Sequence, residues 1–241
     1  GRVQTPTLAM IDQREQEIRN FVPEPYYTIT AAAGGVVYTW RDAKSKGTRT
    51  SSRERAQTIA EQAGQEPLII EKVEKKEKKT FAPMLYDLTE LQREASQRFG
   101  FSAKQTLNLM QSLYENHKVL TYPRTDSRYL TADILPTIRE RLEAVSVGPY
   151  REAAGKAKRQ KLPARPAFVN DTKVSDHHAI IPTEQFVQLN AMSSDERKIY
   201  DLVVRRFLSV LFPPCVYEET SVTARIGAET FTAKGKRILE N

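Results

Sequence analysis

The spacing of hydrophobic positions changes several times along the chain, and each change predicts a different kind of element. Near the start, Leu8, Ile11 and Ile18 mark successive turns of a helix over residues 5–20. Thr5 has a side chain suited to cap that helix at its first turn. The chain therefore opens with a predicted helix, which ends before a proline-containing break.

Stretches rich in β-branched and aromatic residues predict strands in two parts of the sequence. The early strands are expected at residues 26–30, 36–40 and 68–73. Gly34-Gly35 predicts a hairpin between the first two. A short helix capped by Ser52 and ended by Gly64 is expected before the third. The late strands are expected at residues 216–226 and 229–233. The simplest assembly pairs the late strands with the early ones.

The stretch between these strands has a mainly helical pattern. Two segments have the form of a capping box, Thr89-x-x-Gln92 and Ser102-x-x-Gln105. The helix after Ser102 carries a stripe that is expected to be core, consisting of Leu107, Met110 and Tyr114. Further helices are expected at residues 131–145 and 194–211.

Two charged stretches interrupt these patterns. Residues 74–79, with the sequence EKKEKK, are interpreted as a boundary, with phosphate contact as the minor option. Residues 148–167 are expected to form a long exposed loop, which either faces a polyanion such as a nucleic acid or is simply solvated. The basic residues of this loop are Lys156, Lys158, Arg159, Lys161 and Arg165.

Together these patterns predict an α+β fold in which a mainly helical domain is inserted into a β-rich one. The expected limits are a helical segment at residues 1–25, a split β-rich domain at 26–80 and 213–241, and a helical domain at 81–212. Within the insertion, two helices with a tight link lead to a short strand at 119–121. That order is similar to a helix-turn-helix or winged-helix unit.

Composition narrows the class of protein. The chain has 241 residues, of which 39% are hydrophobic and 28% charged, as in globular proteins. A formal charge of +7 favours a polyanionic partner, although many basic proteins bind nothing acidic. The single cysteine, Cys215, rules out an internal disulfide framework, fits a reducing compartment and is expected to be buried. No apolar run reaches the ~18 residues that a membrane span requires.

The candidate chemistry lies in LTYPRTDS, residues 120–127. The hydroxyl of Tyr122 can attack phosphorus and hold the product as a phosphotyrosine ester. The guanidinium of Arg124 can neutralise the phosphate and stabilise the leaving oxygen. Pro123 pushes Tyr122 toward extended geometry, so that the ring is expected to project rather than pack. On the residues alone, a Tyr-Pro turn with a solvated tail is the commoner alternative.

The string TYPRTDSRYL resembles the active-site segment of the type IA DNA topoisomerases, above all the bacterial topoisomerase III branch. Further stretches agree with that family and come in its order, namely GRVQTPTL, DLTELQREAS, KVSDHHAIIPT and TAKGKRIL. The resemblance spans essentially the whole chain. Several motifs in register are far more specific than any one of them.

The resemblance implies roles for the residues of these motifs. Tyr122 would be the nucleophile that attacks single-stranded DNA and keeps the 5′-phosphate, and Arg124 would bind near the scissile phosphate. Thr125, Asp126 and Ser127 would hydrogen-bond phosphate or brace the Tyr122 loop.

The other motifs imply contacts with DNA. His177 matches a histidine that lies against DNA near the active site, where a protonated ring could neutralise phosphate. Lys173 is a candidate for phosphate contact, and Asp176 for orienting the histidine. Arg2 and Gln4 match a segment that follows the single-strand groove in relatives.

No metal site is expected in the chain itself. His177, His178, His117 and the lone cysteine have no metal-ligand spacing, and no DxDxD-like triplet occurs. The resemblance implies Mg²⁺ only for the complete enzyme, where an N-terminal toprim domain would hold it. The chain is accordingly expected to be a central fragment that lacks this domain and a C-terminal part.

The resemblance further implies a β-rich bridging domain and a tyrosine-bearing helical domain that line a large central hole. The complete enzyme would cleave one strand transiently, pass another strand and reseal the first without ATP. The expected partner is single-stranded DNA, with no membrane and no obligate protein partner. A monomer in the cytoplasm, associated with the nucleoid, is expected.

Two rival hypotheses remain at this point. A non-catalytic, single-stranded DNA-binding winged-helix module fits the charge and the helix pattern but leaves Tyr-Pro-Arg-Thr-Asp unexplained. A tyrosine nuclease or recombinase would need arginines and histidines spaced differently around the tyrosine.

Overall fold

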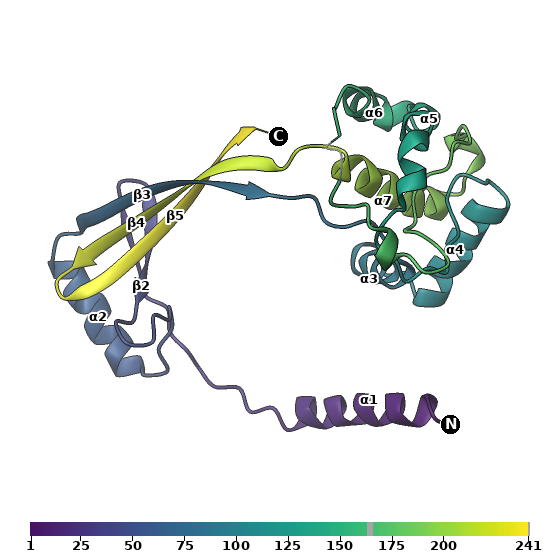
Figure 1. The fold of residues 1–241 in the computed structure, drawn as a ribbon. Coiled ribbons are helices and arrows are strands. Elements are labelled where there is room, and N and C mark those ends of the chain that lie inside the picture. The colour runs from purple at the N-terminus through teal and green to yellow at the C-terminus, as the bar shows by residue number, and fades with distance from the viewer. Residues whose placement is uncertain (163–165, 241) are drawn as a thin grey trace. The chain divides into compact units, whose positions relative to one another are not determined.

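The computed structural model of the chain describes residues 1–162 and 166–240. Its helices and its five-stranded sheet give the α+β fold that the sequence predicts (Figure 1). The chain divides into two compact units. The first comprises residues 1–78 and 217–239, and the second consists mainly of residues 79–216. The domain limits predicted from the sequence, which set residues 1–25 apart, stay a prediction.

The first unit is built on a sheet of strand order β1-β2-β5-β4-β3. The strands are β1 (Thr30–Ala33), β2 (Val36–Arg41), β3 (Ile69–Thr80), β4 (Cys215–Ile226) and β5 (Glu229–Glu240). The β1–β2 turn is formed by Gly34 and Gly35, both with positive φ, as predicted. Trp40 of β2 lies opposite Phe231 of β5 in antiparallel register. The predicted pairing of late with early strands is therefore confirmed.

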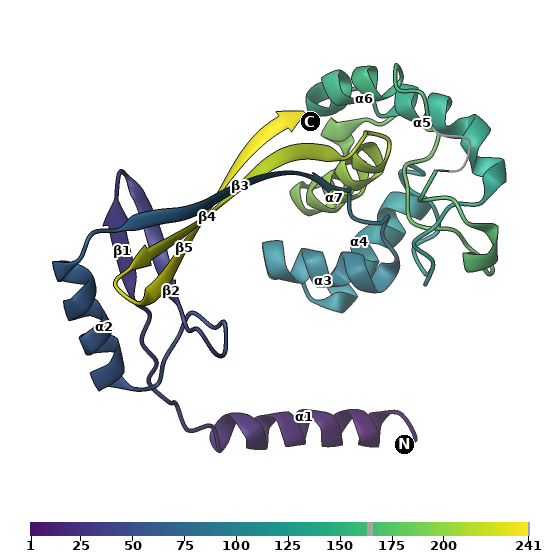
Figure 2. The ribbon, with the colours of Figure 1, turned by 60° about the vertical axis from the view of Figure 1, so that its left-hand side comes forward.

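The core of this unit lies between the sheet and helix α2 (Arg53–Gln65), which lies beside the sheet in Figure 2. Trp40 and Phe231 are fully buried, and Ile59 of α2 packs in the same cluster. The hydroxyl of Ser52 accepts a hydrogen bond from the amide of Arg55, which confirms the predicted cap. The predicted end at Gly64 is wrong, because the helix continues through Gly64 to Gln65.

The charged run at 74–79 forms the second half of strand β3, and the limit between the two units, at Lys78 and Lys79, falls within it. Lys75 pairs with Glu218 at 3.6 Å, and Lys78 pairs with Glu219 at 2.6 Å. Both acids lie on β4, the neighbouring strand in the sheet. Opposite charges across adjacent strands stabilise the pairing of the strands. The sequence of the charged run alone does not predict that β4 is its partner.

The first predicted strand was placed too early. β1 begins at Thr30, and Tyr27 makes only an isolated bridge to Thr50. Helix α1 (Gln4–Arg19) forms as predicted and has no buried residue. Its predicted cap is wrong, because Val3 occupies the capping position and Thr5 already lies inside the first turn, where its hydroxyl accepts from the terminal amine.

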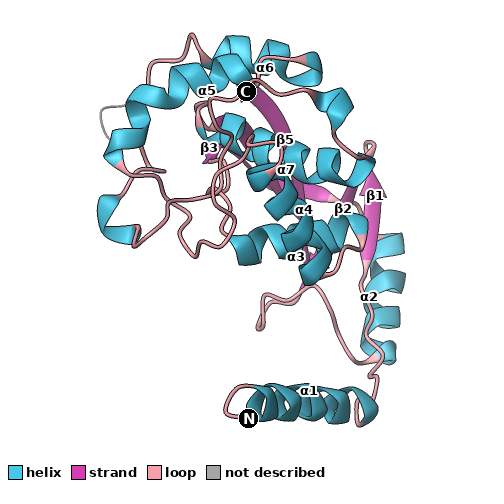
Figure 3. Cartoon of the chain, turned by 90° about the vertical axis from the view of Figure 1, so that its right-hand side faces the viewer, coloured by secondary structure: helices cyan, strands magenta, loops and turns pink. Residues whose placement is uncertain are grey.

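The second unit is a helical assembly around α7 (Ser194–Val210). Its other helices are α3 (Leu88–Phe99), α4 (Ala103–Glu115), α5 (Ile138–Ala144) and α6 (Arg151–Ala157). Figures 1 and 3 show α3 and α4 on one side of α7 and α5 and α6 on the other. Ile199, Val203 and Phe207 of α7 are fully buried, so this helix forms the centre of the core.

The helix caps of this unit were predicted in part. The hydroxyl of Ser102 accepts from the amide of Gln105 at 3.1 Å, as predicted for the start of α4. The predicted cap at Thr89 is wrong. Asp87 caps α3 instead, and its carboxylate accepts from the amide of Glu90 at 2.6 Å. Asp87 and Glu90 have the same three-residue spacing as Thr89 and Gln92, and the carboxylate of Asp87 is a better hydrogen-bond acceptor than the hydroxyl of Thr89.

Two predicted segments of this unit are wrong. The helix expected at 131–145 is a 3₁₀ helix, Ala132–Thr137, followed by α5, because Pro136 cannot donate the amide bond of a continuous α-helix. The loop expected at 148–167 contains α6, whose Ala154 and Ala157 are buried. The basic residues of α6, Arg151 and Lys156, are exposed. The sequence prediction followed these charges and therefore missed the apolar face of the helix. Arg165, expected in that loop, lies outside the described residues.

Two side chains differ in burial from the sequence expectation. In the predicted stripe of α4, Met110 is buried, but Tyr114 is 38% exposed. The buried face is centred instead on Thr106, Met110 and Leu113. Cys215 is half-buried rather than buried. In the part of the chain that is described, no helix has the length and hydrophobicity to cross a membrane.

Candidate functional site

The segment that leads into Tyr122 is fixed by a second stretch of extended chain. The amide of Thr121 donates to the carbonyl of Ile181 at 3.0 Å, and the amide of Thr183 donates to the carbonyl of Val119 at 3.0 Å. Leu120 between them is fully buried. The strand expected at 119–121 is thus a single bridge, which leaves Tyr122 at the edge of a well-packed region.

The ring of Tyr122 is half-buried and contacts two other rings. The centroid of the His177 ring lies 4.2 Å away, with the planes tilted by 39°. The ring of Tyr114 meets it edge-on at 5.6 Å. The expectation that Tyr122 would project freely is therefore wrong, since aromatic contacts of this kind restrict the ring. Tyr114 was assigned to the core from its spacing, and its place at this site was missed.

The hydroxyls after Tyr122 are internal braces. Thr125 is buried, and its Oγ1 donates to the carbonyl of His177 at 2.8 Å and accepts from the amide of Ser127 at 3.1 Å. Ser127 is also buried, and its Oγ donates to the carbonyl of Lys173 at 2.8 Å. These bonds join the tyrosine segment to the segment that carries His177.

Arg124 and Asp126 alternate with these buried residues and are exposed. No ion pair joins their two side chains, both of which are described. The backbone between them is held, because the amide of Leu88 at the start of α3 donates to the carbonyl of Thr125 at 3.1 Å. Arg124 thus presents a fixed positive charge to solvent two residues after Tyr122.

The segment around His177 carries further exposed polar groups. Lys173 and Asp176 are exposed, as is His177 itself. The Nζ of Lys173 lies 5.1 Å from the ring centroid of Tyr129 and within 3.5 Å of its hydroxyl. Lys173, Asp176 and His177 therefore lie on the segment that Thr125 and Ser127 tie to Tyr122.

His178 behaves differently from its neighbour. It is half-buried, and its Nδ1 lies 2.7 Å from the carbonyl of Ala179. Burial lowers the pKa of His178 below its ordinary value, and the nearby charge of Arg141 acts in the same direction. Arg141 is itself buried and donates to the carbonyl of Pro182 at 2.6 Å.

A cavity of about 350 Å³ adjoins Tyr122 and His177. Its lining is mostly polar and consists of Thr121, Tyr122, Thr131, Asp133, Val174, Ser175, Asp176, His177 and His178. Sequence reasoning missed Thr131 and Asp133, because they lie at the start of a 3₁₀ helix and carry no recognisable motif. Only the fold brings them beside Tyr122.

Arg2 and Gln4, also predicted to contact DNA, belong to the first unit, where they are exposed at the start of α1. The residues around Tyr122 all belong to the second unit.

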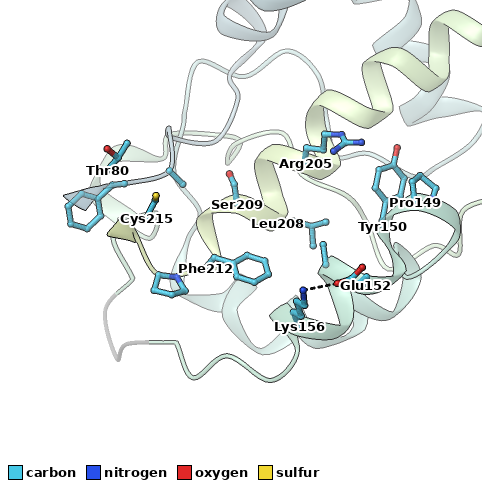
Figure 4. A pocket seen from close by; sticks show the side chains of 14 residues that line it. Thr80, Pro149, Tyr150, Glu152, Lys156, Arg205, Leu208, Ser209, Phe212 and Cys215 are labelled. Atoms are coloured by element: carbon cyan, nitrogen blue, oxygen red, sulfur yellow. Dashed lines mark ion pairs between the residues drawn. The ribbon is translucent and has the colours of Figure 1, made fainter. Parts of the chain in front are cut away.

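A larger cavity of about 720 Å³ lies elsewhere in the second unit, between α6 and α7. Figure 4 shows Glu152 and Lys156 facing each other across its edge, where they pair at 2.7 Å. Cys215 and Thr80 lie at its far end (Figure 4). None of the predicted site residues lines this cavity, so the candidate chemistry belongs to the smaller one.

Within residues 1–162 and 166–240, no three His, Cys, Asp or Glu side chains gather closely enough to hold a metal ion.

The chain is similar to known proteins in both sequence and structure. The sequence profile of the DNA topoisomerase family matches residues 1–241. The chain is 55% identical to DNA topoisomerase 3 of Bacillus licheniformis and 54% identical to that of Bacillus subtilis, in each case over 238 residues. These matches cover 99% of the chain but only 33% of each relative.

A solved structure agrees with the sequence matches. Full-length topoisomerase I from Thermotoga maritima superposes with a TM-score of 0.74 at 28% identity, over 100% of this chain and 39% of that one. The fold, the profile and the curated relatives all lead to the same assignment. The chain belongs to the DNA topoisomerase family.

Proposed function

We propose that this chain is the tyrosine-bearing part of a type IA DNA topoisomerase of the topoisomerase III kind. The observation that carries the proposal is the position of Tyr122, half-buried against the ring of His177 at the edge of a polar cavity. The chain spans about a third of the length of its curated relatives, so the activity is that of the complete enzyme.

The proposed reaction is a reversible exchange of phosphate esters. The Oη of Tyr122 attacks a phosphorus in single-stranded DNA, and the bond from phosphorus to O3′ breaks. The phenolic proton is lost as the departing O3′ gains one, so a 5′-phosphotyrosine ester and a free 3′-hydroxyl result. Because one ester replaces another, resealing needs no ATP.

The surrounding groups have distinct roles in this proposal. Arg124, with its permanent charge, binds the phosphate and stabilises the departing oxygen. His177 contacts the DNA beside the scissile phosphate and assists when its ring is protonated. Thr125 and Ser127, both buried, hold the two segments in place and act as positioning residues.

Further DNA contacts are proposed on both units. Lys173, Asp126 and Asp176 are exposed near the tyrosine segment, and Arg2 and Gln4 are exposed on α1. The net charge of +7 supports a nucleic-acid partner. We propose a preference for single strands, because the nucleophile must reach a strand that is not paired.

The finer architecture and the cellular setting are also proposals. Helices α3 and α4 with the segment up to Tyr122 form a winged-helix-like unit within the bridging and helical arrangement of the family. The complete protein acts as a monomer in the cytoplasm, at the nucleoid, without an obligate protein partner.

Magnesium enters only through the complete enzyme. The described residues do not fit a Mg²⁺ site, since they offer no cluster of three or more acidic or other ligating side chains. We propose that a toprim domain elsewhere in the complete protein holds the ion. No step on this chain's residues is assigned to it.

The rival hypothesis of a non-catalytic DNA-binding module is not favoured, because the whole chain matches a family of enzymes. The decisive experiment places this chain in DNA topoisomerase 3 of Bacillus licheniformis, in exchange for the matching third. The resulting chimera is incubated with a labelled single-stranded oligonucleotide and Mg²⁺, then denatured, and the covalent adduct is measured.

We expect an adduct with the chimera and none with its Tyr122→Phe variant or with the 241-residue chain alone. Tyr122→Phe removes only the hydroxyl, so its folding and noncovalent DNA binding should be nearly unchanged. A full-strength adduct in Tyr122→Phe would place the nucleophile elsewhere and refute the proposal.

A further inference from the structure

The cavity of about 720 Å³ between α6 and α7 has no part in the proposed exchange reaction. We propose that it binds a small aromatic molecule that carries an acidic group, such as a carboxylate or a sulfonate. A molecule bound there contacts both segments that join the second unit to the first, and so slows strand passage. The binding site goes beyond the proposed function, and only its effect on strand passage rests on that function.

The first argument is the size and the apolar character of the cavity. Its volume lies within the range of ligand pockets, roughly 300–1,000 Å³. Most of its lining surface is apolar, and the aromatic side chains of Phe81, Tyr150 and Phe212 contribute to it. Phe81 is 71% exposed, so a ring that lies against it removes apolar surface from water. This wall therefore suits an aromatic ligand.

One side of the cavity is held in place by Asp201, which does not line it. The carboxylate of Asp201 accepts hydrogen bonds from the hydroxyl of Tyr150 at 3.0 Å and from the Nε of Arg205 at 2.8 Å. The ring of Tyr150 also meets the buried ring of Tyr200, with their centroids 6.0 Å apart. This side is therefore preorganised, which lowers the cost of ordering it when a ligand binds.

The second argument is the charge at the edge of the cavity. Among the described residues that line it, Lys156 and Arg205 are cations and Glu152 is the only acid. Lys156 pairs with Glu152 at 2.7 Å, and both side chains are more than half exposed (Figure 4). An exposed pair of this kind contributes at most ~1 kcal/mol, so an acidic ligand can displace Glu152 from Lys156.

Arg205 has hydrogen-bond donors left for the same acidic group. Among the described residues, the hydrogen bonds of its side chain come from Nε and go to Asp201. The donors on Nη1 and Nη2 remain for a ligand, in the planar fork that suits a carboxylate. A neutral ligand would leave these donors unused, and the edge therefore favours an acid.

The third argument is the position of the cavity in the chain. The chain enters the second unit after Lys78 and returns to the first unit after Val216. Thr80 and Phe81 closely follow the first of these points, and Cys215 comes just before the second. All three line the cavity, and Figure 4 shows Thr80 and Cys215 together at one end of it. A molecule that fills the cavity therefore touches both connecting segments.

Occupancy should slow strand passage and spare the ester exchange. In the proposed reaction another strand moves through the break, so the part of the enzyme that carries Tyr122 must move relative to the rest. A ligand that binds one arrangement of the connecting segments better than another stabilises that arrangement. No described residue lines both this cavity and the one beside Tyr122, so adduct formation should be unchanged.

The test uses two fluorescent probes that differ only in the acidic group. Anilinonaphthalene sulfonate carries a sulfonate, and phenylnaphthylamine is the same ring system without it. Titration of the 241-residue chain gives a dissociation constant for each. Arg205→Gln should weaken binding of the sulfonate about fivefold and leave that of the neutral probe unchanged, because one charged contact is lost. Arg197→Gln, the same change at an exposed residue of α7 away from the cavity, should alter neither.

The variant Ala153→Phe identifies the cavity as the site. Ala153 lines it from α6 and is half-buried, so the added ring takes up space that a ligand needs. Both probes should bind about tenfold more weakly, since a ring of the ligand loses its burial. Gly155→Phe is the matched control, because it adds the same ring to the same helix at a residue that does not line the cavity and where a Cβ has open space.

The effect on strand passage is measured in the chimera. Saturating anilinonaphthalene sulfonate should slow the relaxation of a supercoiled plasmid severalfold and leave adduct formation on an oligonucleotide unchanged. With Ala153→Phe, relaxation should proceed at the same rate with and without the probe. Urea unfolding checks that each variant is folded. If Ala153→Phe does not fold, the difference between the probes in Arg205→Gln decides alone.

Unchanged affinity in Ala153→Phe, or an equal effect of Arg205→Gln on both probes, would overturn the binding site. Binding to the 241-residue chain but not to the chimera would mean that another part of the complete protein fills the cavity, and would also overturn it. Relaxation that is not slowed, or is slowed equally in Ala153→Phe, would reject the effect on strand passage. A chimera that binds the probe but forms no adduct would instead refute the proposed function and leave the site standing.

Discussion

The hydroxyl of Thr125 donates a hydrogen bond of 2.8 Å to the backbone carbonyl of His177, 52 residues further along the chain. Thr125 lies three positions after Tyr122, and the ring of His177 lies against the ring of Tyr122. The bond therefore closes a small loop of contacts, in which the position of His177 depends on the segment that carries the nucleophile. We therefore expect the relative positions of Tyr122 and His177 to depend on the hydroxyl of Thr125.

Thr125→Val should loosen the site without changing its shape. Valine has nearly the same volume, but it leaves the carbonyl of His177 and the amide of Ser127 without their partner. We expect a loss of ~1–3 kcal/mol in the free energy of unfolding of the 241-residue chain, measured by urea denaturation. In the chimera, the rate of adduct formation should also fall.

Thr89→Val is the control for this substitution, because Thr89 is exposed on α3. It should change the free energy of unfolding by less than ~0.5 kcal/mol. If Thr125→Val were equally mild, the hydrogen bond to His177 would not be a brace.

Arg124→Ala should damage adduct formation more than His177→Ala does. The guanidinium carries a permanent charge and can bind phosphate through two parallel hydrogen bonds, whereas the two nitrogens of an imidazole ring point in different directions and cannot form such a pair. His177→Ala should lower the rate and alter its dependence on pH. The measurement is the rate of adduct formation by the chimera between pH 6 and pH 9, on a single oligonucleotide.

Arg124→Lys separates charge from geometry in this comparison. If phosphate binding is bidentate, lysine should recover only part of the rate. The reverse order, with His177→Ala the more damaging variant, would contradict the assignment of Arg124 to the phosphate.

The elements of the fold were largely predictable where one short pattern decided them. The glycine pair between β1 and β2 and the serine caps at Ser52 and Ser102 are local signals, and the structure has them where predicted. Strand β3 was predicted only in its first half, because its charges are neutralised by Glu218 and Glu219 from far along the chain. Long-range partners of this kind leave no local trace.

The candidate site divides in the same way. Tyr122 and His177 could be named from a motif, but their ring contact is a property of the fold. Asp133 and Tyr114 could not be found, because nothing in their immediate sequence distinguishes a pocket residue from a helix surface. The motif predicts that Thr125 is either a phosphate ligand or a brace, and its burial is consistent with the second role.

The isolated chain should bind single-stranded DNA weakly, and more tightly than duplex DNA. Its affinity should fall as salt rises, because each phosphate that is neutralised releases counterions. Fluorescence anisotropy at several salt concentrations measures this dependence. Lys173→Ala should make the dependence on salt slightly less steep if Lys173 contacts phosphate. An affinity independent of salt, or a clear preference for duplex DNA, would count against binding of single strands through phosphate contacts.

Arg206 should be the most sensitive charged residue in the core of the second unit. Its side chain is 10% exposed, pairs with Glu94 at 2.6 Å and stacks on the ring of Tyr86 at 4.0 Å. Arg206→Met should cost on the order of 1–3 kcal/mol, because the carboxylate of Glu94 loses one cationic partner and keeps Arg98 at 2.8 Å. Arg205→Met is the control, since Arg205 is an exposed neighbour whose pair with Asp201 contributes at most ~1 kcal/mol.

The double variant Arg206→Met with Glu94→Leu tests the cause of that loss. With neither charge left, stability should recover in part. A double variant no more stable than Arg206→Met alone would show that packing on Tyr86, and not the lost pairing of Glu94, sets the cost.

Acid should destabilise the contact between α4 and α7 through Glu196. Partial burial alone would raise the pKa of Glu196. The hydrogen bonds from Ser112 and from the backbone and side chain of Ser193 outweigh this effect and lower the pKa to about 2. Because this value lies below the ordinary 4.5, the ionised carboxylate stabilises the fold above pH 4.5, and that contribution is lost as pH falls toward 2. We estimate the loss as on the order of 1–3 kcal/mol.

Ser112→Ala tests this linkage directly. The hydroxyl of Ser112 donates to Glu196 at 2.6 Å, and its removal should raise the pKa of Glu196 toward the ordinary value. The variant should be less stable than the parent at pH 7, and the difference should shrink as the pH falls toward 2. Urea unfolding at a series of pH values measures both curves, with Glu140→Gln as an exposed control. If the two curves stayed parallel down to pH 2, the acid sensitivity of the chain would arise elsewhere.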